Sequence, residues 1–298
     1  MTPMNGSLTP DDFAKLLCSE ELGPDLGRVG FKFVRDMLTG IRRTRSVNLT
    51  DIAKGLRENI RLHATHKRLS RNLDNPALAR NLSARMLRLG AANVRADTRL
   101  IVHVYELNKK YARKVEYLPD PRADSGAGFK VCEVLASDPE SETYTPLLTT
   151  VWSDRVPGFT SDIEEIKKSL HRVFDATGGK GMFYFDDHTL NGDSLLPIMR
   201  EQSFNYITMM TDTKADVLYR NELHSLQSLV DSVETPYGQT MFKLIPEGAS
   251  GVTKKTDVDL FVHAGAMAVR LPECERNLRM IALKTKNRFV GEISTPML

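Results

Sequence analysis

Gly181-Met-Phe-Tyr-Phe-Asp-Asp-His188 is an apolar run that ends in two acids. A turn follows at Asn191-Gly-Asp193, then an amphipathic run from Ser194 to Gln202, then a second apolar run, Phe204-Asn-Tyr-Ile-Thr-Met-Met210. This pattern predicts strand, turn, helix and strand. In open α/β sheets the carboxyl ends of strands face the ligand crevice, where a metal-binding carboxylate would stand. Asp186 and Asp187 are therefore candidate metal ligands, although acids before Asn-Gly are also typical of a solvated turn.

The length and composition limit the class of protein. A chain of 298 residues is long enough for a sizeable core and for two domains. It has no run of 18 apolar residues and no signal-peptide pattern at its start, so we expect neither a membrane span nor a membrane partner. Its three cysteines are scattered and form no C-x-x-C pair, which favours a cytoplasmic location over a disulfide framework or a zinc site.

The charge is distributed unevenly along the chain. Residues 28–99 carry 17 Lys and Arg against 5 Asp and Glu, a net charge of +12. The remainder carries 24 against 33, a net charge of −9. A basic module of this kind indicates a partner with dense negative charge.

The first 95 residues, which include most of the basic module, have the pattern of short helices, the first starting at Thr9-Pro10. Arg, Lys and Asn side chains on such helices are the groups that contact phosphates and bases. The alternative is a basic bundle whose charge only keeps it in solution. We expect double-stranded DNA as the partner, bound by Arg42, Arg43, Arg45, Lys54, Arg57, Lys67, Arg68, Arg71 and Asn72.

The rest of the chain changes to strand patterns. Runs at 100–104, 129–136 and 144–152 precede a helix that starts with the capping box Ser161-Asp-Ile-Glu164. The order indicates an α/β domain with a mixed sheet. After residue 212 the apolar runs at 239–245, 258–263, 267–271 and 280–284 are strand-like, and a helix signal remains at 222–233. We therefore expect a helical domain at 1–95 and an α/β domain at 96–298, with a β-rich insertion at about 212–285.

Several stretches, in collinear order, carry a resemblance to a known family. They are Arg28-Val-Gly-Phe-Lys-Phe-Val-Arg-Asp-Met37, Arg45-Ser-Val-Asn-Leu-Thr-Asp-Ile-Ala-Lys-Gly-Leu-Arg57, Lys67-Arg-Leu-Ser-Arg-Asn-Leu73, Lys109-Lys-Tyr-Ala-Arg-Lys-Val-Glu-Tyr-Leu118 and Gly178-Gly-Lys-Gly-Met-Phe-Tyr-Phe-Asp186. The set resembles the bacterial DDE transposases of the insertion-sequence-4 type. The resemblance implies a helical DNA-binding domain and a ribonuclease-H-like domain interrupted by a β insertion. It also implies three carboxylates that hold two divalent metal ions for DNA cleavage and strand transfer.

The catalytic positions depart from this family. The first acid would stand eight residues before the pair Tyr111-Ala112, and that position is His103, a poor ligand for magnesium. The second acid matches Asp186. The third belongs to a helix that would follow the last strand, and the chain ends before it. The resemblance therefore implies a C-terminally truncated relative with a degenerate triad, in which Asp186 alone could still ligate metal.

These departures lead to one expected function and two alternatives. We expect a transposase-like DNA-binding protein, related to cut-and-paste DNA transposition and recombination, that is a pseudoenzyme with no cofactor; any remaining activity would use Mg²⁺. The first alternative is a metal-dependent nuclease or transposase that uses Asp186, Asp187, Asp193 and Glu106 and is completed by another subunit. The second is an interaction protein that pairs with or inhibits a full-length transposase. Homo-oligomers are a further expectation.

Overall fold

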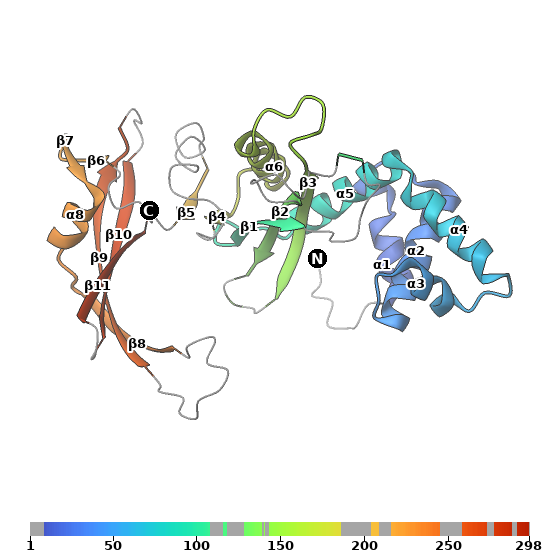
Figure 1. Cartoon of the computed structure of the whole chain (residues 1–298), viewed down its shortest axis with the longest axis horizontal. Coiled ribbons are helices and arrows are strands. Elements are labelled where there is room, and N and C mark those ends of the chain that lie inside the picture. The colour runs from blue at the N-terminus through green and yellow to red at the C-terminus, as the bar shows by residue number, and fades with distance from the viewer. Residues whose placement is uncertain are drawn as a thin grey trace.

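A computed structural model of the chain describes residues 9–107, 116–117, 128–138, 140, 143–185, 204–208, 216–244, 258–272, 277–287 and 291–297. Three parts follow one another along its longest axis (Figure 1). Helices from the N-terminal third lie at one end, a mixed sheet lies in the middle, and a second, antiparallel sheet lies at the other end.

The first part is a bundle of short helices around a small core. Local chemistry sets where they begin: Thr9 Oγ1 accepts a hydrogen bond from the Asp12 amide, and Asn48 and Asn75 cap later helices in the same way. Leu17, Phe33, Ile52, Leu69 and Leu78 are among the buried core side chains. The helices are α1 (Pro10–Leu17), the 3-10 helix η1 (Glu20–Leu22), α2 (Gly27–Thr44), α3 (Leu49–Leu56), α4 (Leu62–Leu73) and α5 (Pro76–Ala91).

The middle part is a five-stranded sheet, called here the first sheet, in the order β3-β2-β1-β4-β5. Strand β2 runs antiparallel to both β1 and β3, whereas β4 is parallel to β1 and β5 is parallel to β4. This order, with only β2 reversed, is that of a ribonuclease-H-like sheet and confirms the expected fold class. The strands are β1 (Arg99–Leu107), β2 (Phe129–Ser137), β3 (Tyr144–Trp152), β4 (Met182–Phe185) and β5 (Tyr206–Thr208).

The alternation of side chains along β1 decides which face of the first sheet is buried. Leu100, Val102 and Val104 belong to one buried cluster with Leu87 of α5 and with Ile166, Leu170 and Val173 of α6 (Asp162–Thr177). Ile101, His103 and Tyr105 lie on the opposite face and are half-buried. Helix α6 starts at the predicted capping box, where Ser161 Oγ accepts a hydrogen bond from the Glu164 amide. Both strands that flank the predicted helix at 194–202 form, while that helix itself lies outside the described residues.

The last part is the second sheet, in the order β11-β10-β9-β6-β7, with β8 also paired to β9. Helix α8 (Leu226–Ser232) packs its buried Leu226, Leu229 and Val230 into the same cluster as Val269 and Met280 of this sheet. The strands are β6 (Asp216–Tyr219), β7 (Glu222–Ser225), β8 (Tyr237–Leu244), β9 (Val258–Arg270), β10 (Asn277–Asn287) and β11 (Gly291–Met297).

Three details of the second sheet differ from the sequence prediction. Residues 222–225 of the predicted helix form β7, and the β structure continues to Met297. The two strands predicted at 258–263 and 267–271 are one strand, β9. Gly265 lies between the two predicted runs, inside β9, where the backbones approach closely: a Cβ there would lie 2.1 Å from the Glu234 carbonyl oxygen. No helix in the described part of the chain is long and apolar enough to cross a membrane.

Candidate nucleic-acid interface

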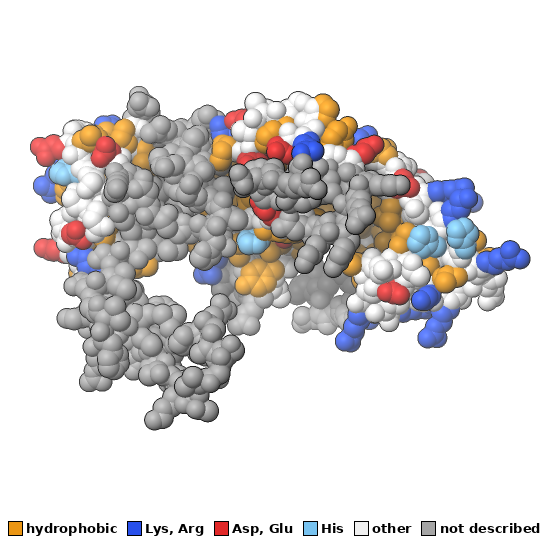
Figure 2. All heavy atoms as spheres, viewed as in Figure 1, with side chains coloured by type: hydrophobic (Ala, Val, Ile, Leu, Met, Phe, Trp, Pro, Cys, Tyr) orange, Lys and Arg blue, Asp and Glu red, His pale blue; other side chains and the backbone are white. Residues whose placement is uncertain are grey.

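The nine residues predicted to contact DNA all lie in the described helical bundle, but they are not equally accessible. Arg42, Arg43, Arg45, Lys54, Arg57, Lys67 and Arg71 are exposed, whereas Arg68 and Asn72 are partly buried. Figure 2 shows Lys and Arg side chains gathered at the end of the molecule that the helices form. The exposed residues come from the C-terminal ends of α2 and α3, from the residues after them and from α4.

Two glycines bring the ends of α2 and α3 together. A Cβ at Gly40 would lie 2.5 Å from Ile52 Cγ2 and 3.0 Å from the Ile52 carbonyl oxygen, so α3 crosses α2 almost in backbone contact. A Cβ at Gly55 would lie 2.5 Å from Thr44 Cγ2. Glycine is unfavourable inside a helix unless close packing requires it. Here the close packing places the last turns of the two helices side by side.

A pocket of about 680 Å³ lies between these last turns. We call it the α2/α3 pocket, and it is lined by Arg43, Thr44, Lys54, Gly55, Leu56 and Arg57. Arg43 Nη1 donates a hydrogen bond to the Gly55 carbonyl oxygen at 3.1 Å, and Thr44 Oγ1 donates to the Gly40 carbonyl oxygen at 2.9 Å. Three cationic side chains and no carboxylate therefore line one pocket.

Both helices end on an arginine in the left-handed region. Arg45 has φ 50° and ψ 34°, and Arg57 has φ 52° and ψ 40°. A left-handed residue other than glycine costs about 1–2 kcal/mol of backbone free energy. Arginine near a helix C-terminus recovers part of that cost, because the negative end of the helix dipole attracts cations. A structural role at the helix ends thus accounts for some of this basic cluster.

Arg68 is held inside the bundle by two carboxylates. Its Nη1 lies 2.6 Å from Asp36 Oδ2, and its Nη2 lies 2.8 Å from Glu58 Oε2. Lys32 Nζ contacts the same two acids at 3.0 and 3.2 Å, and Thr65 donates to Glu58 at 2.7 Å. Burial by itself would raise the pKa of Glu58, but the hydrogen bonds from Thr65, Arg68 and Lys32 lower it to about 2. We call this group the Arg68 clamp; it ties α2, α4 and the residue after Arg57 together.

The clamp changes the interpretation of two predicted DNA contacts. The guanidinium of Arg68 is already occupied by carboxylates, and the Asn72 side-chain amide donates to the Arg68 carbonyl oxygen at 2.8 Å. We therefore assign both residues to the packing of the bundle. The sequence offered a signal that our prediction did not use: Asp36 and Glu58 are isolated acids in a strongly basic region, and isolated acids attract internal partners.

Arg85 is a second internal arginine that the sequence analysis did not single out. It is 1% exposed and donates to the carbonyl oxygens of Leu17 at 3.0 Å, of Ser19 at 2.7 Å and of Pro24. It thereby fixes the chain between α1 and α2 against α5. Net charge alone does not separate such structural arginines from those that remain available at the surface.

The predicted catalytic edge is only partly within the described residues. Register pairs Val102 of β1 with Phe185, the last residue of β4, so His103 lies at the edge where β4 ends. Asp186, Asp187 and Asp193 lie outside the described residues. The rings of His103 and Tyr105 are 5.2 Å apart, and Tyr105 donates to Glu133 at 3.0 Å.

The acids that the structure describes near His103, Glu106 and Asp97, are not grouped as metal ligands. Glu106 is exposed on β1, and Asp97 precedes the strand, where it pairs with Arg95 at 3.2 Å. In the part of the chain that the structure describes, no group of three His, Cys, Asp or Glu side chains could hold a metal ion.

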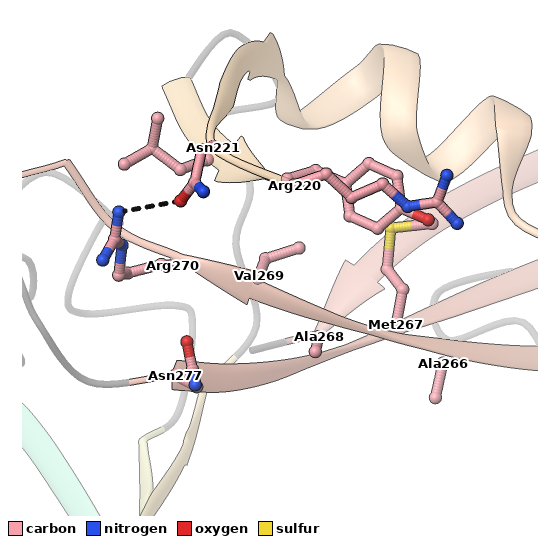
Figure 3. Close-up of a pocket in the computed structure, with 10 residues that line it drawn as sticks. Arg220, Asn221, Ala266, Met267, Ala268, Val269, Arg270 and Asn277 are labelled. Carbon is pink, nitrogen blue, oxygen red and sulfur yellow. Dashed lines mark hydrogen bonds between the residues drawn. The ribbon is translucent and has the colours of Figure 1, made fainter.

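A second polar pocket, of about 540 Å³, lies in the second sheet (Figure 3). The turn between β6 and β7 places Arg220 and Asn221 in the left-handed region, with φ 52° and 68°. The Arg220 guanidinium carbon lies 5.1 Å from the centre of the Tyr219 ring, and Arg270 Nη2 donates to Asn221 Oδ1 at 3.3 Å. Both arginines thus have partners within the pocket, which makes them less available to an anion than the cations of the α2/α3 pocket. The sequence analysis gave these residues no role.

Comparison with known proteins finds likeness only to solved structures, and at a distant level. No protein-family model matches the chain, and no curated protein matches it. A solved structure described as the cryo-EM structure of a piggyBac transposase synaptic complex with hairpin DNA is similar over 99% of this chain and 62% of that chain. The TM-score is 0.44 and the sequence identity is 8%. This chain therefore spans less than two thirds of that protein, and a likeness at this level adds nothing to the fold derived from the strand order.

Proposed function

We propose that the protein is a transposase-like DNA-binding protein that binds duplex DNA through its helical bundle and does not cleave it. One observation carries the proposal: most of the predicted DNA contacts are exposed, while three acids near them in the chain are engaged with other partners. Asp36 and Glu58 are held in the Arg68 clamp, and Asp51 accepts a hydrogen bond from Ser46. Within the described residues, no carboxylate pairs with Arg43, Arg45, Lys54, Arg57, Lys67 or Arg71.

The phosphate backbone of DNA is a suitable partner for such a surface. Each phosphate that a cation neutralises releases condensed counterions, so the affinity falls as salt rises. In a plot of the logarithm of the binding constant against the logarithm of the salt concentration, each phosphate contact contributes about −0.9 to the slope, called here the salt slope. Five or six contacts from the exposed set give a slope of about −5 and a loss of about a thousandfold between 50 and 200 mM salt.

A salt titration of duplex binding tests this function. The full chain and a labelled duplex are followed by fluorescence anisotropy from 50 to 200 mM salt. We expect the steep slope for the wild type and an unchanged slope for Arg172→Gln, which removes an exposed positive charge from α6, outside the bundle. Binding with a flat salt dependence, or no binding at low salt, would contradict the proposal.

The absence of cleavage is a separate part of the proposal and rests on His103. Imidazole is a poor ligand for magnesium, and a single carboxylate at Asp186 would not hold a pair of metal ions. Supercoiled plasmid incubated with the protein and Mg²⁺ or Mn²⁺ should therefore stay supercoiled on an agarose gel. Metal-dependent nicking that Asp186→Ala abolishes would favour the nuclease alternative.

A further inference from the structure

The α2/α3 pocket differs from the rest of the basic surface because its cations converge. Arg43, Lys54 and Arg57 line one pocket, together with Thr44, Gly55 and Leu56. No acid is among these residues, and in the described part of the chain none of the three cations forms an ion pair. Like charges repel each other; the negative ends of the two helix dipoles offset part of this repulsion, and an anion that joins the cations would offset more of it.

The lining residues also indicate the kind of anion. No aromatic side chain lines the pocket, so no ring is available on which a base could stack. The Thr44 hydroxyl is already used as a donor to the Gly40 carbonyl oxygen. Lys and Arg side chains are donors only, and a phosphate offers several acceptor oxygens and negative charge. A phosphate group suits three convergent cations better than a base edge, because a base edge carries no net negative charge.

We infer that the α2/α3 pocket holds a single phosphate group of the nucleic-acid backbone, with Lys54 and Arg57 as its joint ligands. This inference rests on the proposed function and adds which residues act together. Arg43 has one of its donors on the Gly55 carbonyl oxygen, so it contributes mainly through its charge. Phosphate contacts position a protein on DNA and carry no sequence information, so this site strengthens binding to every duplex equally.

The surrounding structure fixes the backbone that carries these ligands before DNA binds. The backbone of Arg57 is left-handed, and the side chain of its neighbour Glu58 is anchored by Arg68, Lys32 and Thr65. The close approach at Gly40 and Gly55 sets the distance between α2 and α3. Arg68 is therefore a positioning residue for the pocket and not a phosphate ligand.

The first test is a comparison of salt slopes among full-chain variants on two duplexes of unrelated sequence. Lys54→Gln with Arg57→Gln should lower the magnitude of the slope by about 0.9, the value for one phosphate, and equally on both duplexes. Between 50 and 200 mM salt, the double variant should then lose about 3.5-fold less affinity than the wild type. Arg172→Gln is the charge-matched control and should keep the wild-type slope.

The outcomes separate this inference from the proposed function. A change of about 1.8 would mean that the two residues meet different phosphates, and no change would mean that the pocket does not meet DNA. Either result overturns the inference but leaves DNA binding intact if the wild-type slope is steep. A flat wild-type slope overturns both.

Two further variants separate binding from folding. Arg57→Gly combined with Lys54→Gln removes both cations but suits the left-handed backbone at residue 57, so its melting temperature should not fall below that of Lys54→Gln while the magnitude of the salt slope falls by about 0.9. Arg57→Lys keeps the charge and should keep the slope close to that of the wild type. A stable double variant with the wild-type slope would exclude the pocket as a phosphate site.

Discussion

At the scale of single residues, Glu58 shows how the bundle uses its few acids. The ordinary pKa of a glutamate is 4.5, and hydrogen bonds to Thr65, Arg68 and Lys32 outweigh burial and lower the pKa of Glu58 to about 2. The folded protein thus binds this proton more weakly than the unfolded chain does. The stabilisation is fully present above pH 4.5 and is lost as the pH falls towards 2.

This residue predicts a specific acid sensitivity. The free energy of unfolding, measured by urea titration between pH 6 and 3, should fall with acid more steeply for the wild type than for Glu58→Gln. The free energy of unfolding of the wild type, relative to that of Glu58→Gln, should therefore fall by roughly 2 kcal/mol between pH 6 and pH 3. Parallel curves for the two proteins would show that the clamp contributes no pH-dependent stability.

Arg68 and Arg71 lie three positions apart but should respond differently to removal. Arg68→Ala leaves the buried Asp36 with only Lys32 and Arg35 as partners, which should cost about 2–3 kcal/mol of stability. Arg71→Ala removes an exposed side chain, so stability should change by less than about 0.5 kcal/mol. Urea unfolding followed by circular dichroism measures both. Equal effects would contradict the assignment of Arg68 to the interior.

These two arginines also mark how far the candidate site was predictable. Charge and helical pattern were enough to predict a basic surface that contains Arg43, Lys54 and Arg57. The pattern could not show that Arg68 faces Asp36, because that pair joins residues 32 positions apart on different helices. Such pairing depends on how helices cross, and single-helix periodicity does not contain that information.

At the scale of elements, the crossing of α2 and α3 depends on Gly40. Alanine usually stabilises a helix by up to about 1 kcal/mol relative to glycine. At this position the added Cβ would meet both a side chain and the backbone of Ile52, at 2.5 and 3.0 Å. Gly40→Ala should therefore destabilise the protein by about 1–3 kcal/mol, despite its better propensity. Thermal unfolding measures this effect.

Gly55 is the matched control for that substitution. Its added Cβ would meet the Thr44 methyl carbon at 2.5 Å, and the nearest backbone atom is 3.5 Å away. A side-chain end can rotate more easily than a backbone can move. Gly55→Ala should thus cost clearly less than Gly40→Ala. A larger cost at Gly55 would mean that the side chain of Thr44 cannot adjust.

The elements themselves were predictable to different degrees. The apolar runs at 100–104, 129–136 and 144–152 match β1, β2 and β3, because each strand buries one face in a strong alternating or continuous pattern. The second sheet was harder to predict. Its hairpin turn at Arg220-Asn221 lacks glycine, and Gly265 lies inside a strand where glycine usually indicates a turn.

At the scale of the whole molecule, the net charge of the helical bundle is positive and that of the remainder is negative. Residues 1–96 carry 17 Lys and Arg against 9 Asp and Glu, a net charge of +8, and residues 97–298 carry 24 against 29, a net charge of −5. A fragment that ends at Ala96 should keep the steep salt slope and bind duplex DNA at least as tightly as the full chain, because the acidic part repels DNA. Anisotropy titration compares them, after circular dichroism has shown that the fragment is helical. Binding that resides only in a fragment of residues 97–298 would contradict the division.

The parallel pairing of β1 with β4 has a consequence for the order of events during folding. Arg99 and Met182 are partners although 83 positions separate them, whereas most contacts within the bundle join helices that follow one another in the chain, α1 with α2, α2 with α3 and α3 with α4. Contacts between distant residues form slowly because a long loop must close first. Stopped-flow refolding should show a fast phase in helical ellipticity and a slower phase in the fluorescence of Trp152, at the end of β3. On the ribosome, the bundle would then emerge and fold before β4 has been synthesised, so a nascent chain could reach DNA before its sheet is complete.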